Sequence, residues 1–386
     1  MIRRVQALEV LTIALAENPV CALLGPRQCG KTTLARRLAE KRKAHYFDLE
    51  AATSRARLEQ APELVLSELR GLVVVDEIQQ LPGLFTTLRP LADRHDVPAR
   101  FLILGSASPE LVKGASESLA GRVGFVDLGG FGLGEVGADE VPTLWLRGGF
   151  PRSFLAASEA ASARWRQSFI RTFLERDIPQ LGIRIPAEAL RRFWMMVAHY
   201  HGQIWNGAEL ARSFGVSETT VRNYLDLLTG TFLLRQLPPW FENLGKRQYK
   251  APKVYVRDTG LLHSLLGIRS REELQGHPKL GASWEGFAVE QVLSVAGAAE
   301  AFYWGTHAGA ELDLVLFRGG QRYGVEFKHA DAPVMTKSLH IALEDLKLEA
   351  AWIVYPGHEA YPVHEKVRVC PLAQLLDELV TRRLTL

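Results

Sequence analysis

Along the first third of the chain, continuous apolar runs alternate with segments whose apolar residues recur at helical spacing. The runs are short and apolar at successive positions, which is typical of strands that are buried on both faces of a parallel sheet. The clearest runs lie at residues 20–25, 44–50, 71–81, 99–108 and 121–128. The pattern predicts an α/β domain over residues 1–150.

Helical periodicity replaces this alternation after residues 147–158. Gly215 permits a sharp turn between two amphipathic segments, and Ser217 is a good N-cap for the second segment. Leu210 and Phe214 lie on one face of the first segment, and Val221, Leu225 and Leu228 line the buried face of the second. The apolar and basic segments that follow suit a wing. We predict a helical, winged helix-turn-helix domain over residues 151–270.

The last third returns to a mixture of strand and helix patterns. Gly319 and Gly320 can supply the positive φ angles of a tight turn, so the runs on either side of them predict a β-hairpin. The other predicted elements are a helix at 283–295, a strand at 301–306, a helix at 335–348 and a strand at 350–356. These elements predict a compact α/β domain over residues 271–386.

Composition agrees with a globular chain, because 47% of the 386 residues are hydrophobic and 23% are charged. No apolar run approaches the ~18–20 residues that span a bilayer. Glu17, Asn18 and Pro19 interrupt the first apolar stretch, which argues against a secretory signal. The three cysteines are odd in number and widely separated, which favours a reducing cytoplasm. We expect a cytoplasmic protein without a membrane partner, and the net charge of +3 permits a nucleic-acid partner.

A phosphate-binding loop is the most specific motif. Gly25, Gly30, Lys31 and Thr32 fill every fixed position of G-x-x-x-x-G-K-[ST], with a strand before the loop and a helix after it. Such a loop turns its backbone N–H groups around phosphates, the lysine reaches the β- and γ-phosphates, and the threonine hydroxyl ligates Mg²⁺. A simple glycine turn beside a surface lysine would not require this full set. The predicted ATP-binding residues are Gly25, Pro26, Arg27, Gln28, Cys29, Gly30, Lys31, Thr32 and Thr33.

Two carboxylates end the apolar run at 71–81. Asp76 and Glu77 follow "VVV", at the edge where open α/β sheets bind their ligands. We expect Asp76 to hold Mg²⁺ and Glu77 to orient and polarise the attacking water. Taken alone, the pair could be a helix cap, but the phosphate loop upstream favours the catalytic role.

The ordered set "GPRQCGKTT", "VVVDEIQ", "LILGSAS" and "SLAGR" resembles the prokaryotic AAA-type ATPases that carry a C-terminal domain of unknown function. The resemblance implies that Ser106 senses the γ-phosphate. It also implies that Arg122 meets the transition state, either in the same subunit or from a neighbour, although an arginine that opens a strand is more often a surface residue. An arginine that acts from a neighbouring subunit would require an assembly, so we expect a homo-oligomer, such as a ring.

The middle domain offers candidate DNA contacts. The exposed face of the second predicted helix would present Thr219, Thr220, Arg222 and Asn223. A basic cluster with aromatic neighbours follows in the wing and suits phosphate contacts; it contains Lys246, Arg247, Lys250 and Lys253. Winged helices also serve as protein-docking modules, so this alternative stays open.

Charged residues interrupt the apolar pattern of the C-terminal hairpin. Strand parity lets Asp313, Glu326 and Lys328 converge on one side, and Glu285 lies on an apolar helical stripe that needs a partner for its charge. With "EFK" as the E-x-K element, the set resembles the PD-(D/E)xK nucleases, especially the Holliday-junction resolvases and restriction enzymes. The resemblance implies a restriction-endonuclease-like fold, Mg²⁺ on Asp313 and Glu326, and Lys328 at the attacking water. The literal "PD" is absent because Leu312 precedes Asp313, and inactive members of the superfamily exist.

Together the patterns predict a Mg²⁺-dependent ATPase that remodels or moves along duplex or branched, Holliday-junction-like DNA and carries a nuclease-like domain that binds or cuts it. The alternative is an ATP-dependent switch whose winged helix and inactive nuclease fold bind proteins.

Overall fold

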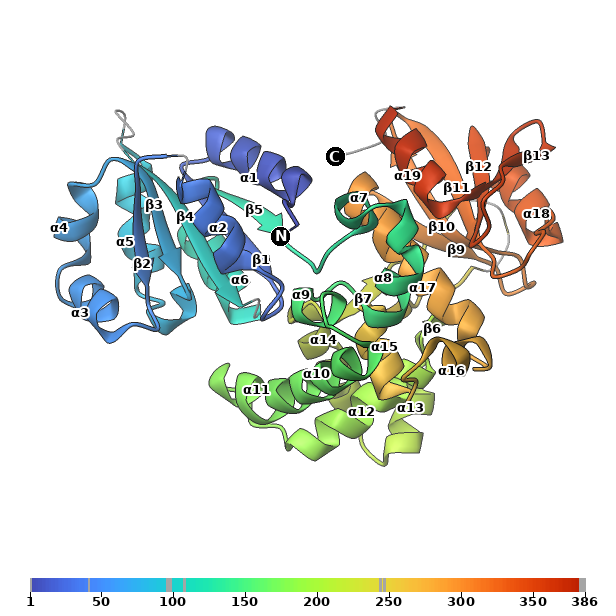
Figure 1. Cartoon of the computed structure of the whole chain (residues 1–386), viewed down its shortest axis with the longest axis horizontal. Coiled ribbons are helices and arrows are strands. Elements are labelled where there is room, and N and C mark those ends of the chain that lie inside the picture. The colour runs from blue at the N-terminus through green and yellow to red at the C-terminus, as the bar shows by residue number, and fades with distance from the viewer. Residues whose placement is uncertain are drawn as a thin grey trace. The chain divides into compact units, whose positions relative to one another are not determined.

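The computed structural model describes residues 2–40, 42–94, 99–106, 109–242, 245 and 248–381 (Figure 1). The chain forms two compact units. The first comprises Met1–Phe131 with Gly230–Phe232, and the second comprises Gly132–Thr229 with Leu233–Leu386. The second and third predicted domains therefore share one compact unit, and the first predicted boundary, near residue 150, falls inside that unit.

A five-stranded parallel sheet in the order β2-β3-β4-β1-β5 forms the centre of the first unit. The strands coincide with the apolar runs of the sequence: β1 (Val20–Gly25), β2 (Ala44–Asp48), β3 (Gly71–Asp76), β4 (Ala99–Ser106) and β5 (Val123–Asp127). Because all neighbours are parallel, the carboxyl ends of the strands meet at one edge of the sheet. The predicted α/β fold with a parallel sheet is confirmed.

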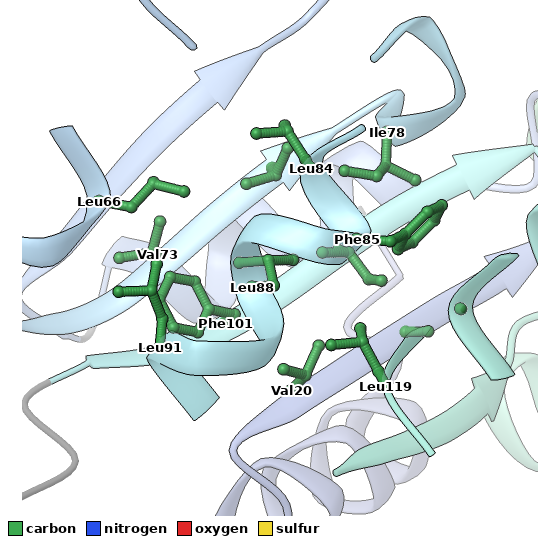
Figure 2. Packing of buried hydrophobic residues seen from close by; sticks show 14 of the residues in the cluster. Val20, Leu66, Val73, Ile78, Leu84, Phe85, Leu88, Leu91, Phe101 and Leu119 are labelled. Carbon is green, nitrogen blue, oxygen red and sulfur yellow. The ribbon is translucent and has the colours of Figure 1, made fainter. Parts of the chain in front are cut away.

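The first unit is completed by α1 (Val5–Glu17), α2 (Lys31–Glu40), α3 (Ala52–Gln60), α4 (Pro62–Ser67), a 3₁₀ turn at Ile78–Gln80, α5 (Leu84–Ala92) and α6 (Pro109–Ser118). Figure 2 shows how the hydrophobic core forms on one face of the sheet, where Val73 and Phe101 of the strands meet Leu88 of α5. Strands β1 and β3 are buried over nearly their whole length, which explains their continuous apolar sequences.

The second unit begins with helices. They are α7 (Leu133–Val136), a 3₁₀ turn at Ala138–Glu140, α8 (Val141–Arg147), α9 (Pro151–Phe154), α10 (Glu159–Thr172), a π-helical turn at Phe173–Asp177, α11 (Ile178–Gln180), α12 (Ala187–His199), α13 (Gly207–Phe214), α14 (Glu218–Gly230), α15 (Thr259–Leu265), α16 (Arg271–Gln275) and α17 (Leu280–Ala296). The predicted helical middle region is confirmed. No helix within the described ranges is long and apolar enough to cross a membrane.

The turn between α13 and α14 follows the sequence pattern closely. Gly215 has a φ of 76°, a left-handed conformation that glycine adopts without strain. The Ser217 hydroxyl oxygen accepts a hydrogen bond from the Thr220 N–H at 3.1 Å, as an N-cap does. Three short strands, β6 (Gln203–Ile204), β7 (Leu234–Leu237) and β8 (Lys253–Val256), form a sheet in the order β6-β8-β7 beside these helices.

The C-terminal part of the second unit contains a mixed six-stranded sheet in the order β13-β14-β12-β11-β10-β9. Its strands are β9 (Ala301–Gly305), β10 (Glu311–Arg318), β11 (Gln321–Phe327), β12 (Ala350–Tyr355), β13 (Tyr361–His364) and β14 (Val367–Pro371), with α18 (Lys337–Asp345) and α19 (Leu372–Thr381) beside them. β10 and β11 form the predicted hairpin, and Gly319 and Gly320 both have positive φ angles in its turn.

The chain between β7 and β8 contacts the C-terminal sheet, which explains why the middle and C-terminal regions form one compact unit. Pro239 forms a parallel bridge with Tyr303 of β9, and Gln248 forms an antiparallel bridge with Thr306. The Trp240 N–H donates a hydrogen bond of 2.7 Å to the Tyr303 carbonyl. The predicted wing therefore extends the edge of the C-terminal sheet, which links the two regions that the sequence placed in separate domains.

A partly buried triad of charges also joins these regions. Glu290 of α17 accepts hydrogen bonds from Arg235 of β7, at 2.9 Å, and from Arg257, which follows β8, at 3.0 Å. Burial by itself would raise the pKa of Glu290, but the two guanidinium groups lower it to about 2. The ionised carboxylate is thus a strong link between the middle sheet and α17.

We predict that Glu290→Gln lowers the free energy of unfolding of the second unit by about 3 kcal/mol at pH 7, because the uncharged amide no longer neutralises the two partly buried guanidinium groups. The folded pKa of Glu290 is depressed, so its contribution is present above pH ~4.5 and is lost as the pH falls toward 2. The difference in free energy of unfolding between wild type and variant should therefore decrease as the pH falls from about 4.5 toward 2.

Urea denaturation followed by tryptophan fluorescence measures this directly, because all 8 tryptophans lie in the second unit. Glu300→Gln is the matched control, since the Glu300 side chain is 62% exposed where it pairs with Arg318, and it should change stability by less than about 0.5 kcal/mol. Equal stability of Glu290→Gln and wild type at pH 7 would contradict the assignment.

Candidate functional site

The phosphate loop connects the end of β1 to the start of α2. A Cβ atom at Gly25 would lie 2.1 Å from the Leu128 carbonyl oxygen, so only glycine permits this close approach of β1 to the chain after β5. Within the loop, Gln28 and Gly30 have φ angles of 63° and 104°. The left-handed turns follow the strand-loop-helix pattern predicted from the motif, and the N-terminus of α2 adds partial positive charge.

Lys31 and Thr32 open α2 and face polar partners from two other elements. The Lys31 ammonium donates hydrogen bonds to the carbonyl oxygens of Gly25 and Pro26, at 2.8 and 2.9 Å. The Thr32 hydroxyl donates to a carboxylate oxygen of Asp76 at 2.9 Å. Asp76 ends β3 and is buried, so the two motifs that are 44 residues apart in sequence meet at the carboxyl edge of the sheet.

This pair fits a magnesium ion. A hydroxyl oxygen and a carboxylate oxygen at hydrogen-bond distance are hard oxygen donors of the kind that Mg²⁺ prefers. When bound there, Mg²⁺ would neutralise charge on the phosphates of a nucleotide. The structure thus brings together the two residues that the sequence assigned to the metal.

Tyr46 completes the surroundings of Asp76 and was missed from the sequence. Its hydroxyl donates to the same Asp76 oxygen that Thr32 contacts, at 2.5 Å. Burial and the neighbouring Asp76 carboxylate raise the pKa of Tyr46, so it keeps its proton. The Arg36 guanidinium lies 5.5 Å from the centre of the Tyr46 ring. The pairing of β2 with β3 places Tyr46 here, and no local sequence signal reveals which strands are neighbours.

Glu77 adopts a left-handed conformation, with φ 57° and ψ 48°. Burial raises the pKa of its carboxyl group above the usual value. The Gln79 side-chain amide donates a hydrogen bond to the Glu77 carboxylate. A partly buried carboxylate with a raised pKa, directly after the metal-binding position, has the properties of a general base.

Arg4 binds backbone carbonyls of the phosphate loop and of the chain after β5. The sequence analysis did not identify it. Its guanidinium donates hydrogen bonds to the Cys29 carbonyl at 3.0 Å and to the Gly130 carbonyl at 2.9 Å. Arg4 precedes α1 and is mostly buried. Nothing in the local pattern distinguishes it from a surface arginine, because these hydrogen-bond acceptors are backbone carbonyls far away in the sequence.

Ser106 and Arg122 lie at opposite ends of the parallel strands: Ser106 is at the carboxyl end and Arg122 is at the amino end. Ser106 ends β4 in register with Gly25, so its backbone reaches the edge of the phosphate loop, while its side chain lies outside the described part of the chain. Arg122 precedes β5 at the other edge, near Val20, and pairs with Asp93 at 2.9 Å. Arg122 is therefore not brought to the phosphate loop of its own subunit, and a role in a neighbouring subunit stays a prediction.

The charged residues of the C-terminal hairpin divide into two groups. Glu285 and Asp313 both accept hydrogen bonds from the ammonium of Lys253, at 3.2 and 3.1 Å. Glu326 instead accepts from the Thr336 hydroxyl at 3.1 Å and pairs with Lys328 at 2.8 Å. The hairpin pairing runs as far as Leu314 and Val325, one residue before Asp313 and Glu326. The two carboxylates have different hydrogen-bond partners, but both act against the effect of burial to raise the pKa of Lys328.

The predicted DNA contact at Lys253 is wrong, because its side chain is only 3% exposed and lies among carboxylates. Burial would lower the pKa of Lys253, but Glu285 and its neighbours raise it well above the usual value. Burial and Asp313 raise the pKa of Glu285 to about 7.

These residues do not fit the predicted magnesium site on Asp313 and Glu326. One oxygen of Asp313 accepts from the Phe327 N–H at 3.0 Å and the other accepts from Lys253. Within the described ranges, no group of three or more His, Cys, Asp or Glu residues is placed to hold a metal ion.

The candidate DNA-contact residues of α14 lie on its outer side. Thr219, Arg222 and Asn223 are exposed, while Thr220 is half-buried beside Ser217. Arg222 pairs with Asp226 one turn later at 3.1 Å. In the wing, Lys250 is exposed, and Lys246 and Arg247 lie outside the described residues.

Comparison with protein families divides the chain into three matches. Residues 17–137 match an AAA domain, residues 138–272 match a domain of unknown function (DUF8612), and residues 280–375 match a domain of unknown function (DUF4143).

Two solved structures illustrate how distant the structural matches are. The Walker-type ATPase PABY2304 of Pyrococcus abyssi is 15% identical, with a TM-score of 0.47 over 69% of this chain and 96% of that one. The Holliday junction branch migration motor RuvB of Thermotoga maritima is 16% identical, with a TM-score of 0.29 over 61% of this chain and 90% of that one. At TM-scores below 0.5, neither carries a conclusion about function.

Whole-chain relatives occur in mycobacteria. The uncharacterized proteins Mb2031c of Mycobacterium bovis and Rv2008c of Mycobacterium tuberculosis are each 52% identical over 385 residues, which cover 98% of this chain and 87% of each relative. The chain, with its AAA domain and the two domains that follow it, therefore belongs to the same family as these mycobacterial proteins.

Proposed function

We propose that this protein is a Mg²⁺-dependent ATP hydrolase. The observation that carries the proposal is the contact of 2.9 Å between the Thr32 hydroxyl and the Asp76 carboxylate, at the end of a complete phosphate loop. Hydroxyl and carboxylate oxygens at that spacing are suited to hold the metal of a nucleotide, while the loop supplies backbone N–H groups and the Lys31 ammonium to the phosphates.

Glu77 is the proposed general base. In the reaction, a water oxygen attacks the γ-phosphorus, the bond from that phosphorus to the ADP oxygen breaks, and the water proton passes to a carboxylate. Glu77 follows the proposed metal ligand Asp76 directly, and burial raises its pKa toward the range in which a carboxylate accepts a proton efficiently.

We expect Glu77→Gln to bind ATP with unchanged affinity and to hydrolyse it at least about 100-fold more slowly, because the amide cannot accept the proton. Lys31→Ala should instead lose nucleotide binding. Phosphate release and the binding of a fluorescent ATP analogue separate the two effects. Glu59→Gln, an exposed change on α3, is the control and should match wild type. Normal turnover in Glu77→Gln would move the base elsewhere, and normal binding in Lys31→Ala would refute the phosphate-loop assignment.

Tyr46 is expected to position Asp76 for the metal. Tyr46→Phe removes one hydrogen bond to a proposed metal ligand, so we predict that half-maximal ATPase activity requires roughly tenfold more Mg²⁺. ATP binding in EDTA should be unchanged, since Tyr46 acts through the carboxylate rather than through the phosphates. An unchanged Mg²⁺ requirement would show that the hydrogen bond has no positioning role.

We further propose that the ATPase acts on DNA through α14. The supporting observation is the pair α13 and α14 around the turn at Gly215, followed by the small sheet of β7 and β8, which is the arrangement of a winged helix. We place the contact on the exposed side of α14, where Thr219, Arg222 and Asn223 are accessible to solvent. The alternative is an ATP-dependent switch that binds proteins through the same surface.

Arg222→Ala should weaken binding to duplex or four-way DNA several-fold and reduce the salt dependence of that binding, because one phosphate contact is lost. Arg171→Ala is the matched control, since Arg171 is also exposed on a helix and paired with an acid one turn later. DNA binding and DNA-stimulated ATP hydrolysis are measured on duplex, single-stranded and four-way substrates. Absence of both on all three would contradict the DNA proposal and favour the protein-binding switch.

A further inference from the structure

The ammonium of Lys253 lies where carboxylates from two elements converge. Glu285 comes from α17 and Asp313 from β10, and one oxygen of each lies 3.2 and 3.1 Å from the Lys253 nitrogen. Glu311 of β10 contacts the same nitrogen. The Tyr255 hydroxyl donates to the Glu285 oxygen that Lys253 also contacts, at 2.7 Å.

Lys253 is held in this position by the backbone of the middle sheet. All four residues of β8 are buried, and β8 is the central strand between β6 and β7. The chain that leads into β8 forms a bridge from Gln248 to Thr306, which directly follows β9. Because both flanks of the residue are paired, the side chain is directed into the carboxylate cluster and not into solvent.

The charges make this arrangement self-consistent. A buried ammonium is costly unless carboxylates surround it, and a cluster of buried carboxylates is equally costly without a cation. Here the charge of Lys253 is compensated by the acidic residues, and their charges are compensated by Lys253. Its raised pKa, which the carboxylates produce against the effect of burial, agrees with a permanently charged lysine.

The ammonium competes with a divalent metal ion for these oxygens. Both Asp313 oxygens already accept hydrogen bonds, from Lys253 and from the Phe327 N–H, and one Glu285 oxygen accepts from both Lys253 and Tyr255. A dication bound at about 2.1 Å to these carboxylates would also lie close to the Lys253 ammonium, and the repulsion between the two positive charges opposes its binding. The ammonium therefore excludes the metal for as long as β8 keeps its place.

We propose that Lys253 is the built-in cation of this cluster, and that Glu285 and Asp313 form a latent divalent-cation site that the lysine keeps closed. With Lys253 in place, this cluster then holds no divalent metal ion. The inference does not depend on ATP hydrolysis or on the DNA contact at α14.

Mn²⁺ binding to the full chain tests the proposal. All proteins carry Asp76→Asn and are free of nucleotide, which removes the proposed metal ligand of the phosphate loop. Mn²⁺ is titrated and the free ion is measured by electron paramagnetic resonance. With Lys253 intact, we expect no Mn²⁺ binding that depends on Asp313.

Lys253→Met keeps the length of the side chain and removes its charge, and it should gain one bound Mn²⁺ per chain. Adding Asp313→Asn should abolish that binding. Lys250→Met, an exposed change three residues earlier, is the matched control and should gain none.

The proposal is overturned if the protein with Lys253 binds Mn²⁺ through Asp313, or if folded Lys253→Met binds none or binds it independently of Asp313. If Lys253→Met does not fold in metal-free buffer, Mn²⁺ should restore its native tryptophan fluorescence, because a ligand that binds only the folded state stabilises it. Failure of Mn²⁺ to restore folding would also overturn the proposal.

Discussion

The close approach of β1 to the chain after β5 is the constraint on which the nucleotide site depends. Gly25 can pass the Leu128 carbonyl only because it has no side chain, and the phosphate loop begins at that point. The loop then returns to the sheet edge, so that Thr32 opens α2 beside the end of β3. The order of the parallel strands places Asp76 within hydrogen-bond distance of the threonine. The candidate metal ligands are thus positioned by backbone packing rather than by the charges themselves.

The second unit depends on a different principle, the pairing of buried charges. Glu290 joins two arginines, and Lys253 joins Glu285 to Asp313. In each case a charge from the middle sheet meets the opposite charge from the C-terminal region. Together with the bridges from the wing to β9, these pairs explain why the two regions form one compact unit.

Much of this organisation could be predicted from the sequence, because it depends on residues that are close together in the chain. Continuous apolar runs identify the parallel strands, Gly215 and Ser217 mark the turn between α13 and α14, and Gly319 marks the hairpin. The phosphate-loop motif and Asp76 were also recognisable, since each combines a strand end with a fixed residue spacing.

The unpredicted features all depend on contacts between remote segments. Tyr46 reaches Asp76 through strand order, and Arg4 reaches the phosphate loop through backbone carbonyls. Lys253 shows the limit most clearly: in sequence it belongs to a basic cluster that suits DNA phosphates, but β8 directs it into the protein. A lysine's neighbours in the chain do not reveal whether its charge meets solvent or a buried carboxylate. Strand parity did bring Asp313 to the segment of β11 that carries Glu326 and Lys328, but it gave no sign that Lys253 also binds Asp313.

The most direct test of the central claim is a single-turnover assay with the purified chain and radiolabelled ATP. The account predicts that ATP is converted to ADP and phosphate in Mg²⁺ and that conversion stops in EDTA while ATP remains bound. A chain that binds ATP with Mg²⁺ but releases no phosphate, alone or with DNA, would contradict the assignment of Glu77 and Asp76 as a hydrolytic site.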